Sequence, residues 1–418
     1  MSRVLMYSQD GQGLGHLRRS FNIANEIRLR DPHCNILIVA DSPAVSILGV
    51  REGIEILKLP TIVKTGRASW RNGTLSMAVG RLVRLRSQLL LHTLREFRPE
   101  TVLIDHMPVG AMGELKPMLD YASSQRRGPK VFLGLRDVID KPEVVRAAWE
   151  QLGAYEYLGA YEAVLVYGNR TVYDATEAYA LASHAREVVY CNYVSPRPVA
   201  TGSDSTRRRP LVLMMGGGGS DAFPLAKTFL EAMPELRSDL DIDAMLLTGP
   251  NMAPVERDRL RRSRGVQIHS SHDDATKLIR QASVIVTMAG YNSLCEVLAW
   301  QRKALVVPRR GPSAEQQIRS SLFSERSLIR RLSPRELTAA RLRERLRQLL
   351  TDDGIPDVAG IPALNGASLA ADLLTEWTPS SAAGRNGSRA DVDDLNGSPA
   401  GAMPAPVQIP PVTVGTPA

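Results

Sequence analysis

Apolar residues follow two patterns along the chain, short runs typical of buried strands and longer segments with helical spacing. Before residue 195, the short runs cover residues 3–7, 35–40, 53–59, 101–104, 131–135, 163–167 and 188–191. Amphipathic segments lie between them, of which residues 17–30 and 75–97 are the longest. Strands that alternate with helices in this way predict a parallel sheet covered by helices.

The alternation stops at residues 195–210, which combine Pro, Ser, Thr and Arg without apolar periodicity, and then resumes. The second series predicts strands at 211–215, 244–248, 266–269, 284–288 and 304–308, with final helices near 334–351 and 367–377. We therefore predict an α/β protein with two Rossmann-like domains facing each other across a cleft. The domains are residues 1–194 and 211–377, joined by a linker at 195–210, and the last helix could pack back on the first domain.

Residues 378–418 are rich in Pro, Gly, Ala and Ser and have no aromatic residue. Such a composition cannot bury a core, so we predict a disordered tail.

Charge and cysteine content narrow the class of protein. The formal net charge is +8, and eight Lys and Arg residues against one acid fall between residues 64 and 98. The three cysteines are far apart and form no cluster with histidine, which indicates neither a disulfide framework nor a zinc site. We expect a cytoplasmic protein with no signal peptide and no membrane span.

The basic segment 64–98 has three interpretations. It could rest on the inner, anionic face of a membrane, bind a lipid-linked or anionic acceptor, or form a packed helix with a solvated arginine face. Arg81 and Arg84, which alternate with large aliphatic residues, are the candidates for contact with an acceptor. Nucleic acid is not expected, because few aromatic residues accompany the arginines.

A first glycine loop, Gly11 to His16, follows the first predicted strand and opens the first helix. Its spacing departs from the GxGxxG of dinucleotide sites, and Asp41 lies beyond the usual distance for a ribose acid. A histidine at a helix N-terminus is expected to stay neutral and able to accept a proton, so His16 is either a catalytic base or a residue that caps the helix or fills a groove.

Asp105 ends the predicted strand 101–104, at the functional edge of a parallel sheet. It is a second candidate base. Its alternative role is to cap a helix beginning near Val109.

The second half presents two more polar turns after strands. Four successive glycines at 216–219, followed by Ser220, indicate a backbone that approaches a ligand closely, plausibly a phosphate. The turn at 288–292 leads into a helix that carries Glu296, which could reach the hydroxyls of a sugar.

These segments resemble the family 28, MurG-like glycosyltransferases, as a divergent member. The shared features are an acidic turn before a helix, a small-residue turn with glycine, a Ser/Thr-x-x-Glu helix, a strand ending in Pro and a Gln-containing loop. In this sequence they are His272-Asp273-Asp274, Ala289 to Ser293, Glu296, ALVVP at 304–308 and Glu315-Gln316-Gln317. GQGLGH at 11–16 and GGGGS at 216–220 resemble the glycine loops of the family, and CNYVSPR at 191–197 weakly resembles its linker.

The resemblance implies the GT-B fold, with a nucleotide-sugar bound mainly by the C-terminal domain and an acceptor bound by the N-terminal domain. It implies a UDP-sugar as co-substrate and no metal or other cofactor. The implied donor nucleotide and phosphate ligands are Gly217, Gly218, Gly219, Ser220, Ser271, His272, Ala289, Gly290, Asn292, Ser293 and Glu296, with Glu296 on the ribose. Gln316 and Gln317 would contact the donor sugar, His16 would lie near the reacting centre, and Gly13 and Gly15 would face the acceptor.

The expected reaction is transfer of a sugar to an acceptor hydroxyl by direct, inverting attack, with glycine-loop amides and helix N-termini stabilising the leaving group. Two alternatives remain from the sequence. One is a UDP-sugar 2-epimerase on the same fold, and the other is a non-catalytic protein that binds a nucleotide-sugar or a lipid.

Overall fold

The computed structural model describes most of the chain before residue 378. The described residues are 2–11, 13–43, 45, 51–66, 69–196, 208–261, 265–271, 275–352 and 360–377. The predicted tail, 378–418, and most of the predicted linker, 195–210, lie outside them. The domain boundaries therefore stay predictions, and we use "N-terminal half" for residues 2–196 and "C-terminal half" for residues 208–352.

The N-terminal half is built on a parallel sheet, as predicted. Within the described residues it has seven strands in the order β3-β2-β1-β6-β7-β8-β9. The strands are β1 (Arg3–Ser8), β2 (Asn35–Ala40), β3 (Ile54–Lys58), β6 (Thr101–Asp105), β7 (Lys130–Arg136), β8 (Ala163–Tyr167) and β9 (Val188–Tyr190). Its helices are α1 (Gly15–Arg30), α2 (Val79–Phe97), α3 (Lys116–Ser124), α4 (Pro142–Gln151), α5 (Tyr155–Leu158) and α6 (Ala175–Ala178).

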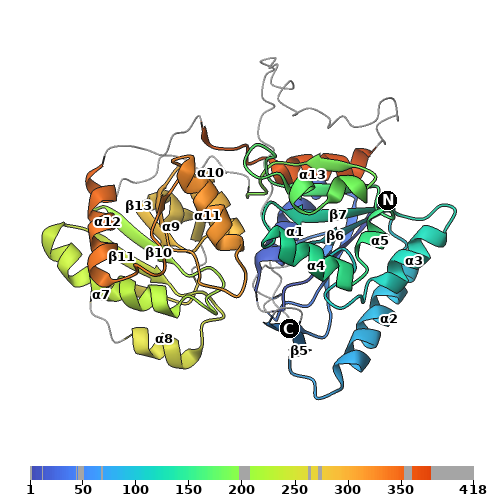
Figure 1. Ribbon diagram of the computed structural model, residues 1–418, viewed down its shortest axis with the longest axis horizontal. Coiled ribbons are helices and arrows are strands. Elements are labelled where there is room, and N and C mark those ends of the chain that lie inside the picture. Colours follow the sequence, from blue (N-terminus) through green and yellow to red (C-terminus); the bar gives the residue numbers. More distant parts are fainter. Residues whose placement is uncertain are drawn as a thin grey trace, which may run out of the picture. The chain divides into compact units, whose positions relative to one another are not determined.

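The C-terminal half repeats the arrangement with six described strands in the order β12-β11-β10-β13-β14-β15, all parallel. They are β10 (Leu211–Met215), β11 (Asp243–Leu247), β12 (Gln267–His269), β13 (Ala282–Thr287), β14 (Lys303–Val306) and β15 (Arg330–Arg331). The helices are α7 (Phe223–Asp239), α8 (Pro254–Leu260), α9 (Ala275–Gln281), α10 (Tyr291–Ala299), α11 (Glu315–Glu325) and α12 (Ala339–Thr351). Figure 1 shows these helices around the strands of their sheet.

The central strands are fully buried runs, which is why they pair on both sides in parallel. All five residues of β6, β8 and β10 are buried. α4, α7 and α8 each have a proline in the first turn. Proline is favoured there because its fixed φ suits a helix and the backbone N–H that it lacks would have no partner within the helix. Regular strand ends therefore present their loops along one edge of each sheet.

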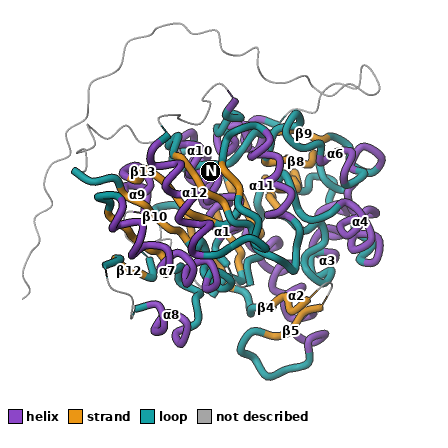
Figure 2. Tube along the Cα trace, turned by 60° about the vertical axis from the view of Figure 1, so that its left-hand side comes forward, coloured by secondary structure: helices purple, strands orange, loops and turns teal. Residues whose placement is uncertain are grey.

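A short antiparallel hairpin, β4 (Ile62–Gly66) and β5 (Ser69–Asn72), lies outside both sheets. The sequence analysis missed it. It contacts α2, and Figure 2 shows it beside that helix. Ile62 and Leu82 form a small buried cluster there, with Trp70 and Met77 partly buried around it.

One face of α2 is buried in the protein, so not every basic residue of the segment 64–98 is available to a partner. Leu82, Arg86, Leu90 and Leu94 recur every four residues and are all buried. Arg86 is fully buried and pairs with Asp41 at 3.1 Å and with Glu114 at 3.0 Å. Arg86, one of the eight basic residues of the segment, therefore does not contribute to the surface charge. Its charge is buried and compensated by two carboxylates.

The last described helix, α13 (Gly366–Glu376), returns to the N-terminal half and packs against α1. Thr101 Oγ1 donates a hydrogen bond to the carbonyl of Leu374 at 3.2 Å, and Lys130 Nζ donates to the carbonyl of Trp377 at 2.8 Å. Gly366 begins the helix against the backbone of residues 191–193. The chain therefore crosses from the C-terminal half back to the N-terminal half.

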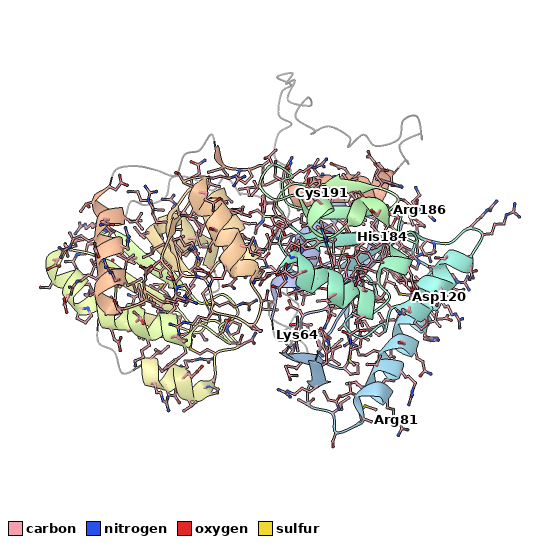
Figure 3. The ribbon with its side chains drawn as sticks, in the orientation of Figure 1. Lys64, Arg81, Asp120, His184, Arg186 and Cys191 are labelled. Carbon is pink, nitrogen blue, oxygen red and sulfur yellow. The ribbon has the colours of Figure 1, made fainter. Side chains whose placement is uncertain are left out.

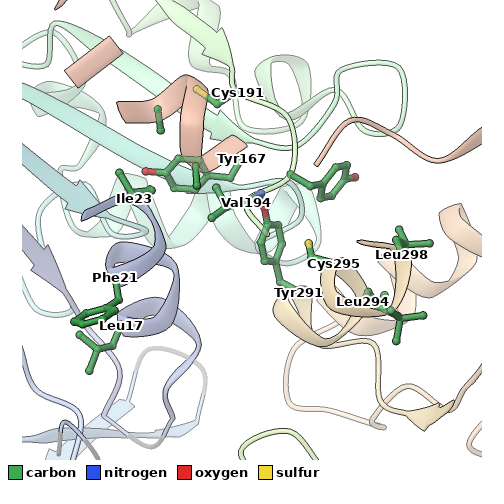
Figure 4. Packing of buried hydrophobic residues seen from close by; sticks show 14 of the residues in the cluster. Leu17, Phe21, Ile23, Tyr167, Cys191, Val194, Tyr291, Leu294, Cys295 and Leu298 are labelled. Carbon is green, nitrogen blue, oxygen red and sulfur yellow. Dashed lines mark hydrogen bonds between the residues drawn. The ribbon is translucent and has the colours of Figure 1, made fainter. Parts of the chain in front are cut away.

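One buried apolar cluster includes residues of both halves. Leu17, Phe21 and Ile23 of α1 belong to it together with Tyr291, Leu294 and Leu298 of α10. Val194 lies between them and donates its backbone N–H to Tyr291 Oη at 2.7 Å (Figure 4). The described residues of both halves and α13 form a single compact unit.

We predict that Gly366→Ala destabilises the protein and that Gly80→Ala does not. A Cβ at Gly366 would lie 2.6 Å from the carbonyl oxygen of Asn192, which would push α13 away from the backbone of residues 191–193. A Cβ at Gly80, in the first turn of α2, would meet nothing within 4 Å. Thermal unfolding should show a fall of several degrees in Tm for the first variant only, from a loss of about 1–3 kcal/mol. Equal Tm values for the two variants would contradict close packing of the start of α13 against residues 191–193.

Candidate functional site

The first glycine loop is held by Asp10, which caps α1. Asp10 Oδ2 accepts the backbone N–H of His16 at 3.0 Å and of Leu17 at 3.4 Å. A Cβ at Gly13 would lie 2.6 Å from Asp10 Oδ1, so the close passage of the loop requires glycine there. Asp10, rather than His16, therefore satisfies the free amides at the start of the helix.

His16 is thereby free to pair with Asp105. Its Nδ1 lies 2.6 Å from Asp105 Oδ2. The two residues meet because β1 and β6 are neighbours in register, with Ser8 opposite Asp105. An ionised carboxylate only accepts hydrogen bonds, so this contact favours a proton on Nδ1 of His16. This is the arrangement of a general base with a carboxylate that orients it.

Arg19 completes the group from the next turn of α1. Its Nε and Nη2 lie 3.0 and 2.8 Å from Asp105 Oδ1, and both side chains are about 1% exposed. Burial would raise the pKa of Asp105, but Arg19 and then His16 more than offset it and hold that pKa below its usual range. Arg19 Nη2 also lies 2.8 Å from His16 Nδ1, because Asp105 accepts from both. The carboxylate that orients His16 thus stays ionised.

The alternative role predicted for Asp105, capping a helix near Val109, is wrong. The backbone there forms turns, and the next helix, α3, begins at Lys116. The carboxylate oxygens of Asp105 instead pair with Arg19 and His16.

His106 is a site residue that the sequence analysis did not select. Its backbone has φ of +77°, which is strained for a residue other than glycine and typical of functional sites. The centroids of the His106 and His16 rings are 4.6 Å apart. His106 Nδ1 is buried and has no hydrogen-bond partner among the described residues. Burial lowers the pKa of His106 well below its usual value, and the charges of Arg136, His16, Arg19 and Lys64 lower it further. His106 is therefore a neutral imidazole with an unused polar atom beside the candidate base.

In the C-terminal half, the predicted second glycine loop is folded against the next loop of the sheet. Gly219 has φ of +94°, and a Cβ there would lie 2.5 Å from the carbonyl of Thr248. Gly217 also has positive φ, +60°. A side chain is therefore excluded at Gly219, and the positive φ of Gly217 also favours glycine there.

The turn at 288–290 lies next to that glycine loop. Met215 and Thr287, the last residues of β10 and β13, are opposite each other, and Thr287 Oγ1 donates to the carbonyl of Met215 at 3.1 Å. A Cβ placed on Gly217 or on Gly290 would lie 3.9 or 3.8 Å from Ser293 Oγ. The structure thus brings together the glycine loop, the turn and the first turn of α10.

The two glycine regions of the chain also meet. Asn292 Nδ2 donates to the carbonyl of Gly15 at 3.0 Å, which joins the N-terminus of α10 to that of α1. Glu296, one turn further along α10, pairs with Arg18 of α1 at 3.1 Å. Burial raises the pKa of Glu296, and Arg18 opposes that rise.

Gln316 and Gln317 lie in the first turn of α11 and hold the loop that follows β14. Gln316 Oε1 accepts the N–H of Arg309 at 3.0 Å. Gln317 donates to the carbonyl of Arg309 at 2.7 Å and accepts from Arg331 at 2.8 Å. Both ends of the Gln317 amide are therefore occupied within the protein. Contact of either residue with a donor sugar stays a prediction.

Glu315, next to them, joins an arginine from each half. It lies 2.6 Å from Arg136, at the end of β7, and 2.7 Å from Arg309. Arg136 holds the pKa of Glu315 below its usual range against the effect of burial, with help from Arg319 and Arg309.

A fully buried ion pair also joins the halves, between Arg319 in α11 and Asp137 after β7. Arg319 donates Nη2 and Nε to the two Asp137 oxygens at 2.7 and 3.0 Å, and each side chain is 1% exposed. Arg319 also donates to the carbonyl of Ala289 at 3.0 Å. The guanidinium carbons of Arg19 and Arg319 lie 5.3 and 5.6 Å from the centre of the Tyr291 ring.

The remaining predicted residues lie apart from this centre or outside the described residues. Arg81 and Arg84 are exposed on α2, and Figure 3 shows Arg81 projecting from that helix. Ser271 is exposed after β12. His272 and the last residue of the linker-like segment 191–197 lie outside the described residues. Ser220 is exposed at the end of the glycine loop, whereas Ala289 is fully buried.

We predict that His106 makes the protein less stable as pH falls from about 7 to 5. In the unfolded chain the imidazole binds a proton below about pH 6.5. In the folded protein the pKa of His106 is lower, so the unfolded state binds more protons and is favoured by acid.

His106→Asn should reduce this loss, because asparagine does not titrate and tolerates positive φ. Denaturant unfolding at several pH values measures it, and His92→Asn, at an exposed position of α2, is the control. Equal slopes of unfolding free energy against pH in wild type and His106→Asn would show that His106 titrates normally.

Residues 211–355 match the family model described as glycosyltransferase family 28 C-terminal domain. A stretch of 144 residues is 28% identical to the UDP-N-acetylglucosamine–N-acetylmuramyl-(pentapeptide) pyrophosphoryl-undecaprenol N-acetylglucosamine transferase of Exiguobacterium sp. strain AT1b. That stretch is 34% of this chain and 39% of the relative, so less than half of either protein is matched.

Solved glycosyltransferase structures share the fold over most of the chain. The kitacinnamycin glycosyltransferase matches with a TM-score of 0.61 and 18% identity, covering 89% of this chain and 98% of its own. The calicheamicin glycosyltransferase CalG4 has a TM-score of 0.58 at 13% identity, covering 89% and 96%. MurG of Acinetobacter baumannii has a TM-score of 0.54 at 15% identity, covering 90% and 99%. The predicted GT-B fold is therefore confirmed, and the resemblance to the family 28, MurG-like glycosyltransferases is supported over residues 211–355.

Proposed function

We propose that the protein transfers a sugar from a UDP-sugar to an acceptor hydroxyl, with inversion and without a metal ion. The observation that carries the proposal is the position of the His16–Asp105 pair. His16 lies in the first turn of α1, whose N-terminus contacts the N-terminus of α10 through Gly15 and Asn292, and Asp105 reaches it from the end of β6. A base from one half therefore lies beside the turn that the family resemblance assigns to the donor.

The donor would occupy the C-terminal half. The amides of Gly217 to Ser220 and of Asn292 and Ser293 would bind the diphosphate, since these loops meet at Ser293 and α10 directs its free N–H groups there. Glu296 would accept hydrogen bonds from the ribose hydroxyls, as the resemblance implies. Ser271 and His272 would face the base.

The reaction follows from the orientation of His16. Nε2 of His16 takes the proton of the acceptor hydroxyl as its oxygen forms a bond to the anomeric carbon. The bond from that carbon to the β-phosphate oxygen breaks, and its electron pair leaves with UDP. Asp105 stabilises the imidazolium that forms, and the loop amides stabilise the charge that grows on the diphosphate.

We further propose an amphiphilic, lipid-linked acceptor that reaches the N-terminal half from an anionic membrane surface. Leu75, 47% exposed, and the partly buried Trp70, Met77 and Met107 support an apolar contact near His106. Arg81 and Arg84 supply exposed positive charge on the adjoining helix. No helix of the described residues is long and apolar enough to cross a membrane. Flotation with anionic vesicles at low salt should carry the protein upward, and failure to float would exclude membrane contact.

A donor screen tests the proposed activity. We expect UDP and at least one UDP-sugar to raise the Tm of the protein, and Glu296→Gln to weaken that binding by about tenfold. If no nucleoside diphosphate changes Tm, the donor site is wrong. Interconversion of a UDP-sugar without any acceptor would instead identify an epimerase.

The base is tested separately. His16→Ala should lower turnover of the donor by about a hundredfold or more while leaving its affinity for UDP unchanged. Asp105→Asn is a second variant with the same expected direction, because it keeps the shape and loses the charge. Full turnover by His16→Ala would assign the base to another residue.

A further inference from the structure

Arg18 is a charged residue of the N-terminal half that contacts the C-terminal half at the proposed ribose ligand. Its Nη1 lies 3.1 Å from Glu296 Oε1. The Arg18 side chain is 43% exposed and that of Glu296 is 15% exposed. Arg18 therefore has room to move, whereas Glu296 is largely enclosed.

The two helices that carry this pair run side by side from their N-terminal ends. Gly15, the first residue of α1, contacts Asn292, the second residue of α10. Arg18 and Glu296 lie three and four residues further along, which is about one helical turn, or 5.4 Å. An arginine side chain can span that distance, so the Arg18 guanidinium can reach the N-terminus of α10.

A bound nucleotide would change the balance of charge at this point. Ribose hydroxyls that donate to Glu296 compete with Arg18 for the same carboxylate. A diphosphate at the N-terminus of α10 brings a larger negative charge one turn away. Guanidinium groups bind phosphate oxygens strongly and in two-pronged geometry, so the diphosphate is the better partner for Arg18.

We propose that Arg18 is a donor-binding residue that exchanges Glu296 for the diphosphate when the nucleotide binds. This inference rests on the proposed function and adds to it a charge from the N-terminal half. In the empty site, Arg18 pairs with Glu296 across the halves. In the loaded site, it stabilises the leaving group from the side of the acceptor, so departure of UDP is favoured only while both halves are in contact.

The test compares UDP with uridine as probes, by titration calorimetry, in wild type and two variants. Uridine reports the Glu296 contact, and UDP reports that contact together with the diphosphate. Arg18→Ala should weaken UDP binding by about tenfold or more and change uridine binding by less than about threefold. Arg18→Lys should recover part of the loss, since it keeps a charge without the two-pronged geometry.

Arg170→Ala is the matched control. Arg170 lies in the N-terminal half, is 45% exposed and pairs with Asp174 at 3.0 Å, so its loss removes a similar exposed ion pair outside the site. We expect both affinities to equal those of wild type in this variant.

Two other results would overturn the inference. Equal changes in the UDP and uridine affinities of Arg18→Ala, including no change in either, would mean that Arg18 acts through Glu296 alone or not at all. A wild-type protein that binds uridine and UDP equally, or binds neither, would overturn the UDP donor as well. The first result leaves the proposed function intact, so the two failures are distinguishable.

Discussion

The buried ion pair between Arg319 and Asp137 is the constraint on which the arrangement of both halves depends. Each side chain is 1% exposed, and the two are joined by paired hydrogen bonds across the halves. Loss of one partner would leave an uncompensated charge in a dry interior, which typically costs about 3–5 kcal/mol. The pair therefore resists separation of the halves more strongly than the less buried pair of Arg18 with Glu296.

The same arginine links this tie to the chemistry. Arg319 binds the carbonyl of Ala289, in the turn before α10, and lies over the ring of Tyr291. Arg19 lies over that ring too and holds Asp105 beside His16. Two buried arginines thus lie near the ring of a single tyrosine, one holding the turn before α10 and the other holding Asp105 beside the candidate base.

The sequence predicted those features that depend on local patterns. Both parallel sheets and the glycine loops followed from apolar runs ending in polar turns, because buried parallel strands read as continuous apolar segments. Glu296 and His16 were found for a similar reason, since each lies near the N-terminus of a helix that follows a strand.

The features that it missed depend on contacts between distant residues. Nothing local distinguishes Arg86, buried on α2, from Arg84, exposed two residues earlier on the same helix. His106 gained meaning only from its positive φ and its position beside His16. Arg19, Arg136 and Arg319 read as ordinary surface charge until their partners, 86 to 182 residues away, were in place. The histidine after Asp105, at the carboxyl end of a strand, was the one signal that could have been used.

The central claim is that both halves contribute to one site, with the donor diphosphate between the second glycine loop and α10 and with His16 facing the sugar. A crystal structure with UDP bound tests it most directly. The account predicts diphosphate oxygens within hydrogen-bonding distance of the amides of Gly217 to Ser220 and of Ser293, ribose hydroxyls on Glu296, and His16 Nε2 open toward the β-phosphate. UDP bound away from these loops, or His16 turned away from it with Asp105 unpaired, would contradict the account.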